Sequence, residues 1–377
     1  MYYLTNLILK QFRNYESQYV EFNRGLNIFV GSNAQGKTNI LEAIYYLSVT
    51  RSFRTRRDQE LTQIGNQLFF LKGVFLKEEF YHVVQISYQR NSPLKILSNN
   101  EKVERFLHIQ RFPVVVFSPD DLMIIRDSPA IRRRFLNLEI SKFKGTYFQN
   151  LKEYQRVLLQ RNRLLKENRY NSHLNKMLDP WDQALVNVGT KIIHDRIEMV
   201  EDLGKKAQFF FNQMYGEKAN LTLNYRCSVG CFEQPDETRT KFHGALSEGR
   251  RIELKRGSTM YGPHLDDLKI AINGNNTRYY SSQGQKRAAA LSLKMAEAMI
   301  LKEKTGLNPV ILLDDVFSEF DRVRKEYLLL FLKENGGQCF LTSAVDIDDL
   351  LKKTEKDYKV MAVEQGRIVS ETGGLSC

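Results

Sequence analysis

The chain has 377 residues, 42% of them hydrophobic, which is enough for two or three domains or for one large domain with an insertion. Its formal charge of +12 favours an anionic partner, most often nucleic acid, although scattered surface lysines would give the same balance. Four cysteines are too few for a disulfide framework, and there is neither a secretory leader nor an uncharged apolar run of membrane-spanning length, so we expect a soluble protein of the reducing cytoplasm.

The N-terminal part of the chain has the pattern of a sheet interrupted by one helix. Strand-like alternation is present in four segments, residues 3–9, 18–22, 26–30 and 68–97. Between the third and fourth, apolar side chains recur at helical spacing, at Ile40, Leu41, Ile44 and Leu47. The order of strand, glycine-containing loop and helix predicts a phosphate-binding loop.

The middle of the chain is predicted to be a helical insertion. Residues 121–215 contain few glycines and carry apolar side chains at three-four-seven spacing, with interruptions expected at Asn171, Pro180 and Gly189. Strands are expected to return over residues 221–280, with a turn at residues 273–274. Such an insertion is too short to form the long coiled-coil arms of an SMC-type structural protein.

The segment Gly-Ser-Asn-Ala-Gln-Gly-Lys-Thr, residues 31–38, has the spacing of a Walker A loop. Its glycines let successive backbone N–H groups converge on phosphate oxygens at a helix N-terminus. In such a loop the lysine neutralises phosphate charge and the threonine hydroxyl ligates Mg²⁺. The residues expected to bind ATP here are Gly31, Ser32, Asn33, Ala34, Gln35, Gly36, Lys37, Thr38 and Asn39.

Two carboxylates follow a second strand much later in the chain. Residues 309–313 are apolar without alternation, as in a central parallel strand that is covered on both faces. Asp314 and Asp315 come directly after it, at the strand end where open α/β sheets place their chemistry. We expect Asp314 to serve, with Thr38, as a Mg²⁺ ligand and Asp315 to orient or deprotonate the attacking water.

Shortly before this strand the chain resembles the signature motif of the ABC-type ATPases. The resemblance rests on residues 280–294, with Ser282 and Gly284 in the serine and second-glycine places, and a D-loop-like segment follows at residues 318–321. A helix N-terminus with a small hydroxyl residue and a glycine is itself an anion site. The resemblance implies that this site closes over the ATP of a second subunit, through Ser282, Gln283, Gly284 and Gln285.

The chain as a whole resembles the RecF family of bacterial recombination-repair proteins. The segments that carry this resemblance are residues 12–15, 51–55, 117–122, 128–136, 160–163, 262–268 and 282–285. It implies an α/β fold: an ABC-type ATPase head with mixed β-sheets, formed by residues 1–105 and 255–377, and a mainly helical lobe of residues 106–254 inserted between the Walker A and signature motifs.

The same resemblance implies a function. Members of this family are expected to form an ATP-dependent homodimer that binds double-stranded and gapped DNA, to work with RecO and RecR in loading the RecA recombinase, and to be associated with the nucleoid. Two departures matter: Leu265 replaces a family arginine, and Ser343 and Ala344 stand where an ABC switch histidine is expected. Leu265 removes any contact that would be carried over from the family arginine. The missing imidazole, together with an aspartate in place of the usual catalytic glutamate, implies slow hydrolysis, and the resemblance implies a weak, DNA-dependent ATPase.

Three basic clusters are candidates for contact with DNA phosphates. The first contains Arg51, Arg54, Arg56 and Arg57, the second Arg132, Arg133 and Arg134, and the third Arg161, Arg163 and Lys166. Clustered cations would bind a phosphate backbone without reading sequence. Intramolecular ion pairs are the alternative for each cluster, and Arg51 or Arg54 could instead touch the nucleotide.

Two other functions share part of these features. A nucleotide-binding subunit of an ABC transporter would have the same phosphate loop, but the helical insertion and the basic charge argue against it. A metabolic phosphoryl transferase would use the loop without needing the signature segment. Replacing Ser282 would then leave ATP turnover intact.

Overall fold

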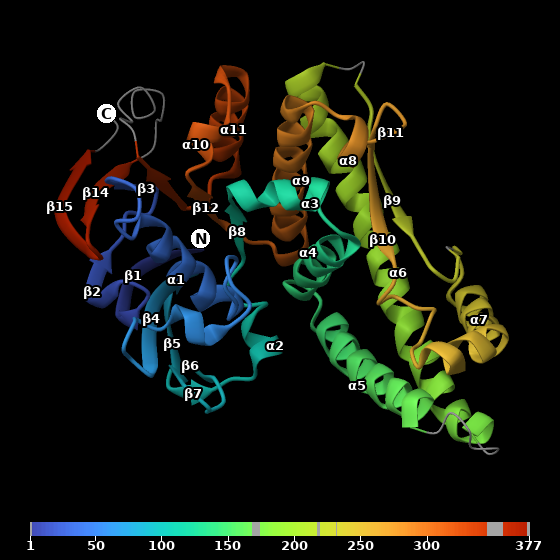
Figure 1. The fold of residues 1–377 in the computed structure, drawn as a ribbon. Helices are drawn as coiled ribbons and strands as arrows, with labels where there is room; N and C mark the ends of the chain where they lie inside the picture. The colour runs from blue at the N-terminus through green and yellow to red at the C-terminus, as the bar shows by residue number, and fades with distance from the viewer. Residues whose placement is uncertain (1, 168–173, 217–218, 231, 345–356, 375–377) are drawn as a thin grey trace. The chain divides into compact units, whose positions relative to one another are not determined.

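A computed structural model describes residues 2–167, 174–216, 219–230, 232–344 and 357–374. The chain forms two compact units, one made of residues 1–121 and 290–377 and the other of residues 122–289 (Figure 1). These divisions lie later in the chain than the lobe limits at residues 105 and 254 that the sequence suggested. Among the described residues, no helix is both long enough and apolar enough to cross a membrane.

The first unit contains two six-stranded sheets, and its mixed α/β architecture confirms the expected fold class. One sheet is antiparallel and has the strand order β2-β1-β4-β5-β6-β7. Its strands are β1 (Tyr2–Phe12), β2 (Tyr15–Glu21), β4 (Leu68–Lys77), β5 (Phe80–Gln89), β6 (Lys95–Ser98) and β7 (Glu101–Lys102). The strands predicted over residues 68–97 are therefore present.

The second sheet is largely parallel and has the order β15-β14-β3-β13-β12-β8. Its strands are β3 (Leu26–Val30), β8 (Val114–Phe117), β12 (Val310–Asp314), β13 (Cys339–Ser343), β14 (Tyr358–Glu364) and β15 (Arg367–Gly374). In this sheet the edge strand β15 runs antiparallel to its neighbour. Both β12 and β13 are buried at every residue, and for β12 the apolar run without alternation predicted this.

Helix α1 (Lys37–Val49) lies between these two sheets and contacts strands of both. It is buried over nearly its whole length and on all sides, rather than along one amphipathic stripe. The other helical segments that this unit contains are η1 (Asp58–Leu61), α2 (Arg105–His108), η2 (Pro119–Asp121), α10 (Val316–Glu319), α11 (Arg322–Asn335) and most of α9 (Gln283–Thr305).

The second unit is mainly helical, as predicted for the insertion. Its helices are α3 (Leu122–Arg126), α4 (Pro129–Ser141), α5 (Gly145–Glu167), α6 (Leu174–Tyr215), α7 (Pro235–Arg256) and α8 (Thr277–Tyr280), and α9 begins here. A small antiparallel sheet joins β9 (Leu221–Arg226), β10 (Asp267–Ile272) and β11 (Asn275–Asn276).

Two expectations for this region were wrong. Helix α6 is not interrupted at Pro180 or Gly189, while Asn171 lies outside the described residues. Proline near the start of a long helix costs one backbone hydrogen bond, which packing can offset. Residues 235–256 form helix α7 rather than strands, and its end signals were missed: Pro235 in the first turn and Gly257 as a left-handed cap.

Candidate nucleotide site

The phosphate loop connects β3 to α1, and its two glycines are required by both conformation and space. Gly31 has φ 147° and Gly36 has φ 117°, values that favour glycine. A Cβ at Gly31 would lie 2.4 Å from the carbonyl oxygen of Val363, and one at Gly36 would lie 2.8 Å from the side chain of Asn14. Any side chain at either position would displace the loop from its supports.

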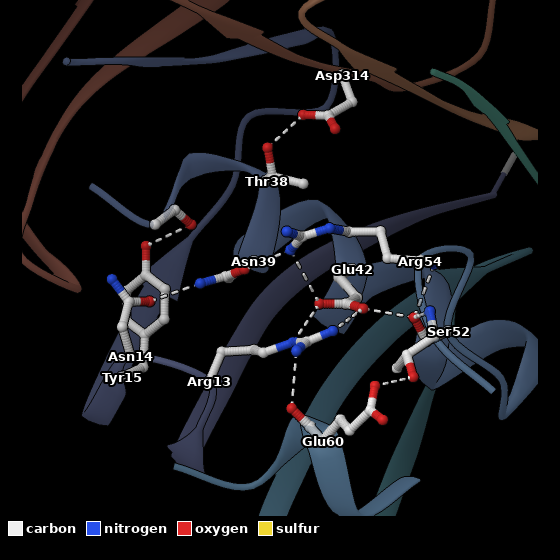
Figure 2. Close-up of polar contacts among 12 residues, drawn as sticks. Arg13, Asn14, Tyr15, Thr38, Asn39, Glu42, Ser52, Arg54, Glu60 and Asp314 are labelled. Carbon is white, nitrogen blue, oxygen red and sulfur yellow. Dashed lines mark hydrogen bonds and ion pairs between the residues drawn. The ribbon is translucent and has the colours of Figure 1, made fainter. Parts of the chain in front are cut away.

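Two distant turns hold the phosphate loop. Asn14 Nδ2 donates to the Gln35 carbonyl at 3.0 Å. The Tyr15 hydroxyl donates to the Gly36 carbonyl at 3.1 Å (Figure 2). From the other end of the chain, the Gly366 amide donates to the same Gln35 carbonyl at 2.9 Å. The loop backbone is therefore fixed by the β1–β2 and β14–β15 turns before any ligand is considered.

The Lys37 ammonium group lies inside the curl of the loop. Its Nζ donates to the carbonyl oxygens of Gly31 at 2.6 Å and Ser32 at 2.8 Å, and the side chain is buried. Burial lowers the pKa of Lys37, whereas the nearby carboxylates of Asp315 and Asp314 raise it. A partly desolvated cation at this position is suited to neutralise a phosphate group.

Asp314 meets the phosphate-loop helix at the carboxyl end of β12. The Thr38 hydroxyl donates to Asp314 Oδ1 at 2.6 Å (Figure 2). The Thr342 hydroxyl donates to the same oxygen at 3.0 Å. Burial raises the pKa of Asp314, and the hydrogen bonds from Thr38 and Thr342 oppose that rise. Residues that are 276 positions apart in sequence thus share one polar contact, as the motifs predicted.

The oxygens of Thr38 and Asp314 fit a Mg²⁺ ion. Both are hard donors, and Mg²⁺ is usually held by one or two protein oxygens together with waters and substrate phosphates. The described residues contain no cluster of three or more His, Cys, Asp or Glu side chains suited to a metal. A two-oxygen site of this kind suits an ion that arrives with a nucleotide better than a permanently bound metal.

Asp315 is placed differently from its neighbour. The strand ends at Asp314, and Asp315 takes a left-handed conformation with φ 50° and ψ 27° as it begins α10. Its amide donates to the Thr342 hydroxyl at 2.9 Å. Asp315 is half-buried while Asp314 is buried, so the Asp315 carboxylate is the more accessible of the two to solvent.

Sequence reasoning missed a buried carboxylate beside the loop. Glu42 is fully buried on α1, and its carboxylate accepts hydrogen bonds from Nε and Nη2 of Arg13 at 2.7 and 2.8 Å. Arg54 lies 3.5 Å from Glu42 and also donates to Asn39 Oδ1 at 2.8 Å (Figure 2). A glutamate inside an otherwise apolar helix, next to an arginine-rich loop, was the available signal.

The signature segment begins helix α9 in the second unit. Ser282 Oγ accepts the Gln285 amide at 3.2 Å, and Gln285 Oε1 accepts the Ser282 amide at 2.9 Å. This reciprocal pair is a capping box, which stabilises the helix start. Ser282 and Gln283 are exposed, and Gly284 and Gln285 are half-buried. The phosphate loop and both aspartates belong to the other unit.

Comparisons with known proteins agree with these motifs. The RecF/RecN/SMC N-terminal domain family matches residues 3–369. The DNA replication and repair protein RecF of Clostridium novyi (strain NT) is 36% identical, and the match covers 95% of this chain and 98% of that relative. The chain belongs to the RecF family. A RecF relative from Halothermothrix orenii (strain H 168 / OCM 544 / DSM 9562) is 38% identical, with 97% and 98% covered.

Solved structures support this RecF-family fold. The structure of the recombination mediator protein RecF-ATP in the RecFOR pathway has a TM-score of 0.89 and 36% identity, and it covers 99% of this chain and 98% of that chain. The Smc head domain of Pyrococcus furiosus, bound to the C-terminal domain of ScpA, has a TM-score of 0.54 at 16% identity, which supports the fold alone. The family match runs through the helical unit, which the transporter interpretation does not explain.

The structure corrects two of the expected DNA contacts in this family member. Arg161 is fully buried and pairs with Asp182 at 2.5 Å and Glu253 at 2.7 Å. Arg132 is also buried and pairs with Asp267 through both Nε and Nη2, at 2.7 and 2.9 Å. Both guanidinium groups are used inside the second unit, so neither is available to a DNA backbone.

The remaining candidates differ in their exposure. Arg51, Arg54, Arg56 and Arg57 are exposed in the loop between α1 and η1. Arg133 and Arg134 are half-buried, and Arg133 donates to the Asp266 carbonyl at 2.7 Å. Arg163 and Lys166 are exposed on α5, where Arg163 pairs with Glu167 at 2.9 Å. The loop of residues 51–57, called the basic loop below, is the densest exposed group of arginines among the predicted clusters.

Proposed function

We propose that this chain is an ATP-dependent DNA-binding protein of recombination repair. The observation that carries the proposal is the contact between Thr38 and Asp314 beside the buried Lys37, which brings the two halves of a phosphate-loop nucleotide site together. The relation to RecF proteins over nearly the whole chain, including one solved with ATP, supports ATP as the nucleotide and DNA repair as the process.

Each part of the site has a defined role in binding ATP. The backbone N–H groups of residues 31–38 would bind the phosphates at the N-terminus of α1, and Lys37 would neutralise their charge. Thr38 and Asp314 would hold Mg²⁺, which supplies further charge neutralisation on the β- and γ-phosphates. Thr342 fixes the orientation of the Asp314 carboxylate by a second hydrogen bond to the oxygen that Thr38 contacts.

We further propose that hydrolysis is slow and depends on DNA. Asp315 would orient the attacking water, but its side chain is one methylene shorter than the glutamate of many ABC-type ATPases. Strand β13 ends at Ser343, and Ala344 follows, so the place of a switch histidine holds no imidazole. ATP would then act as a binding signal whose removal releases the complex.

The active assembly is proposed to be a homodimer. In this arrangement Ser282, Gln283, Gly284 and Gln285 of one copy contact the nucleotide held by the other. The position of Ser282 supports this role, because an exposed small hydroxyl next to the first N–H groups of α9 can receive an incoming anion. ATP would therefore control whether two copies hold together.

DNA is proposed to meet the basic loop, and gapped DNA is proposed as the preferred substrate. Four exposed arginines within seven residues favour binding to phosphates without reading of sequence. In this function the protein would act with RecO and RecR to load RecA-like recombinase at single-strand gaps. The RecFOR pathway named for the similar solved structures supports these partners.

Light scattering of the whole protein tests nucleotide control, dimerisation and DNA binding together. The mass is measured alone, with Mg-ATP, with duplex DNA, and with both. A shift to dimer mass with ATP and a further gain with DNA are expected. Lys37→Met should bind no ATP and remain monomeric in every arm, because the phosphate charge would meet no buried cation.

A wild-type protein that stays monomeric at saturating ATP would refute the dimer. Equal DNA binding with and without ATP would refute nucleotide control. A matched control is Lys10→Met, because Lys10 is exposed on β1 and the exchange removes the same charge from the same unit. Its behaviour should match that of the wild-type protein.

A further inference from the structure

The β1–β2 turn, residues 13 and 14, and the adjoining Tyr15 contact both the phosphate loop and the segment around the basic loop. On one side it supports the phosphate loop, through Asn14 and Tyr15, and the Asn39 side chain donates to Asn14 Oδ1 at 2.8 Å. On the other side Arg13 extends away from that loop, toward Glu42 and Glu60 (Figure 2). Three consecutive residues therefore join elements that lie apart in sequence.

Glu42 contacts the start of the basic loop, and Arg13 contacts helix η1, which directly follows the loop. The Ser52 hydroxyl donates to Glu42, and Ser52 Oγ accepts the backbone amides of Arg54 and Thr55, both at 2.9 Å. In η1, directly after the basic loop, the Glu60 carbonyl accepts a hydrogen bond from Arg13 Nη1 at 2.7 Å. The Thr55 hydroxyl donates to the Glu60 carboxylate, which closes the loop. The buried carboxylate of Glu42 thus ties the backbone of the basic loop to the phosphate-loop helix.

The charges in this network leave one arginine weakly held. Glu42 is fully buried, so it needs a cationic partner. Arg13 supplies that partner through two hydrogen bonds, whereas Arg54 approaches only to 3.5 Å and its side chain is 41% exposed. Arg54 can therefore turn to an external phosphate without leaving a buried charge unpaired. Its second contact, Asn39, is adjacent to Thr38 in the nucleotide site.

We infer that Arg13 and Glu42 are positioning residues that couple the phosphate loop to the basic loop. Phosphate groups of ATP bound at the first loop would raise the affinity of the second loop for the phosphates of DNA, and DNA would raise the affinity for ATP by the same factor. This inference rests on the proposed function and adds the route by which the two sites communicate.

The test compares a coupling ratio in wild-type protein and in Arg13→Gln. Affinity for a fluorescein-labelled duplex is measured with and without Mg²⁺ and a non-hydrolysable ATP analogue, and affinity for the analogue is measured with and without the duplex. Wild type is expected to show a ratio of about 5-fold or more, the lower range of measured couplings. In Arg13→Gln the ratio should fall close to one, because Glu42 then captures Arg54 in place of the lost cation.

Controls separate this role from general damage. Arg24→Gln removes an exposed arginine from the same unit and should keep the wild-type ratio. Arg13→Lys restores the positive charge and should recover part of the ratio. Ser52→Ala is a smaller change that removes the hydrogen bond between Glu42 and the basic loop, and it should also lower the coupling ratio. This variant provides the test if Arg13→Gln does not fold.

The results distinguish a failure of the positioning role of Arg13 and Glu42 from a failure of the proposed ATP-dependent DNA binding. Wild-type protein with a ratio of one would overturn the proposed ATP-dependent DNA binding. A coupled wild type, together with an unchanged ratio in folded Arg13→Gln or in Ser52→Ala, would overturn the positioning role alone. Agreement between the ratios measured from the ATP side and from the DNA side is required by linkage and checks each measurement.

Discussion

Asp315 occupies a backbone conformation that few residues tolerate. Its φ of 50° lies in the left-handed region, where aspartate and asparagine are found more readily than other non-glycine residues. This turn separates a half-buried carboxylate from the buried Asp314 and begins α10. Asparagine can keep the turn while removing the negative charge, so the role of the carboxylate can be tested without changing the backbone.

Asp315→Asn is expected to bind ATP normally and to accumulate as the ATP-bound dimer, because an amide cannot accept the proton of the attacking water. Turnover should fall by roughly 100-fold, within the usual range for loss of a general base. Size-exclusion chromatography with ATP and a phosphate-release assay measure the two effects. If Asp315→Asn is found entirely as monomer at saturating ATP, or if its turnover equals that of the wild-type protein, the proposed role of the carboxylate is contradicted.

The arginines predicted to contact DNA show that burial and long-range ion pairs could not be predicted from the sequence. Arg161 and Arg163 were assigned to one basic cluster because they are close in sequence, yet Arg161 is fully buried and Arg163 is exposed. The partners of Arg161, Asp182 and Glu253, come from helices α6 and α7, at distances in sequence that no local pattern encodes. Motif residues such as Lys37 and Thr38 were predicted because the chemistry of phosphate binding fixes their spacing.

At the scale of elements, helix packing explains why a glycine stands at position 189 in the middle of α6, which the sequence did not suggest. A Cβ there would lie 2.6 Å from the Phe242 ring of α7 and 3.1 Å from the Tyr154 ring of α5. The glycine therefore allows three helices to approach one another, and α6 continues through it. The sequence correctly predicted a helical region but treated this glycine as a break.

Gly189→Ala is expected to destabilise the second unit by about 1–3 kcal/mol, the usual cost of overpacking. Gly244→Ala in α7 is the matched control, because a Cβ at that position would meet nothing within 4 Å. That exchange should stabilise the same unit by about 0.5–1 kcal/mol through helix propensity. Trp181, the single tryptophan of the chain, lies on α6 and reports urea unfolding of this unit by fluorescence.

The short helix α2 contributes a pH-sensitive contact to the first unit. His108 is fully buried and its Nε2 donates to the Leu47 carbonyl of α1 at 2.6 Å. Burial lowers the pKa of His108 to about 4; the hydrogen bond to the Leu47 carbonyl opposes this shift, and Arg111 and Arg105 lower the pKa further by smaller amounts. Because the folded state disfavours the protonated ring, its contribution to stability is complete above the ordinary pKa of about 6.5 and is lost as the pH falls toward 4.

Wild-type protein should therefore lose roughly 3 kcal/mol more stability than His108→Gln between pH 7 and pH 4. Glutamine keeps a donor for the Leu47 carbonyl but does not titrate. Urea denaturation followed by circular dichroism measures the difference, and His243→Gln is the control because His243 is exposed on α7. Parallel pH profiles for wild type and His108→Gln would show that the imidazole does not carry this loss.

At the scale of the whole molecule, the proposed composite site separates nucleotide binding from dimerisation. Ser282→Arg should block ATP-induced dimers, because a bulky cation would occupy the place of the small hydroxyl at the start of α9. Binding of a fluorescent ATP analogue to the monomer should stay within about 3-fold of wild type, since the residues predicted to hold the phosphates all belong to the first unit. Dimers of the variant at wild-type ATP concentrations would argue against a two-copy site.

The fold class and the order of motifs were predictable because strand alternation, helical spacing and phosphate-loop chemistry are local signals. The long-range supports of the site were not. Val363 and Gly366 contact the phosphate loop from more than 300 residues away, and their segment carries no motif that announces such a role. Glu42 was missed for a similar reason, because its partners Arg13, Ser52 and Arg54 come from two separate segments outside its own helix.

The place of β3 in its sheet has a consequence for how the protein is made. This strand, which leads into the phosphate loop, lies between β13 and β14 among the described strands, and both of these are near the C-terminal end of the chain. The second unit, by contrast, is one continuous stretch of residues 122–289. During synthesis the helical unit can therefore fold while the phosphate loop still lacks its neighbours. The first motif to leave the ribosome is among the last to be completed, so a truncated product would not assemble a nucleotide site.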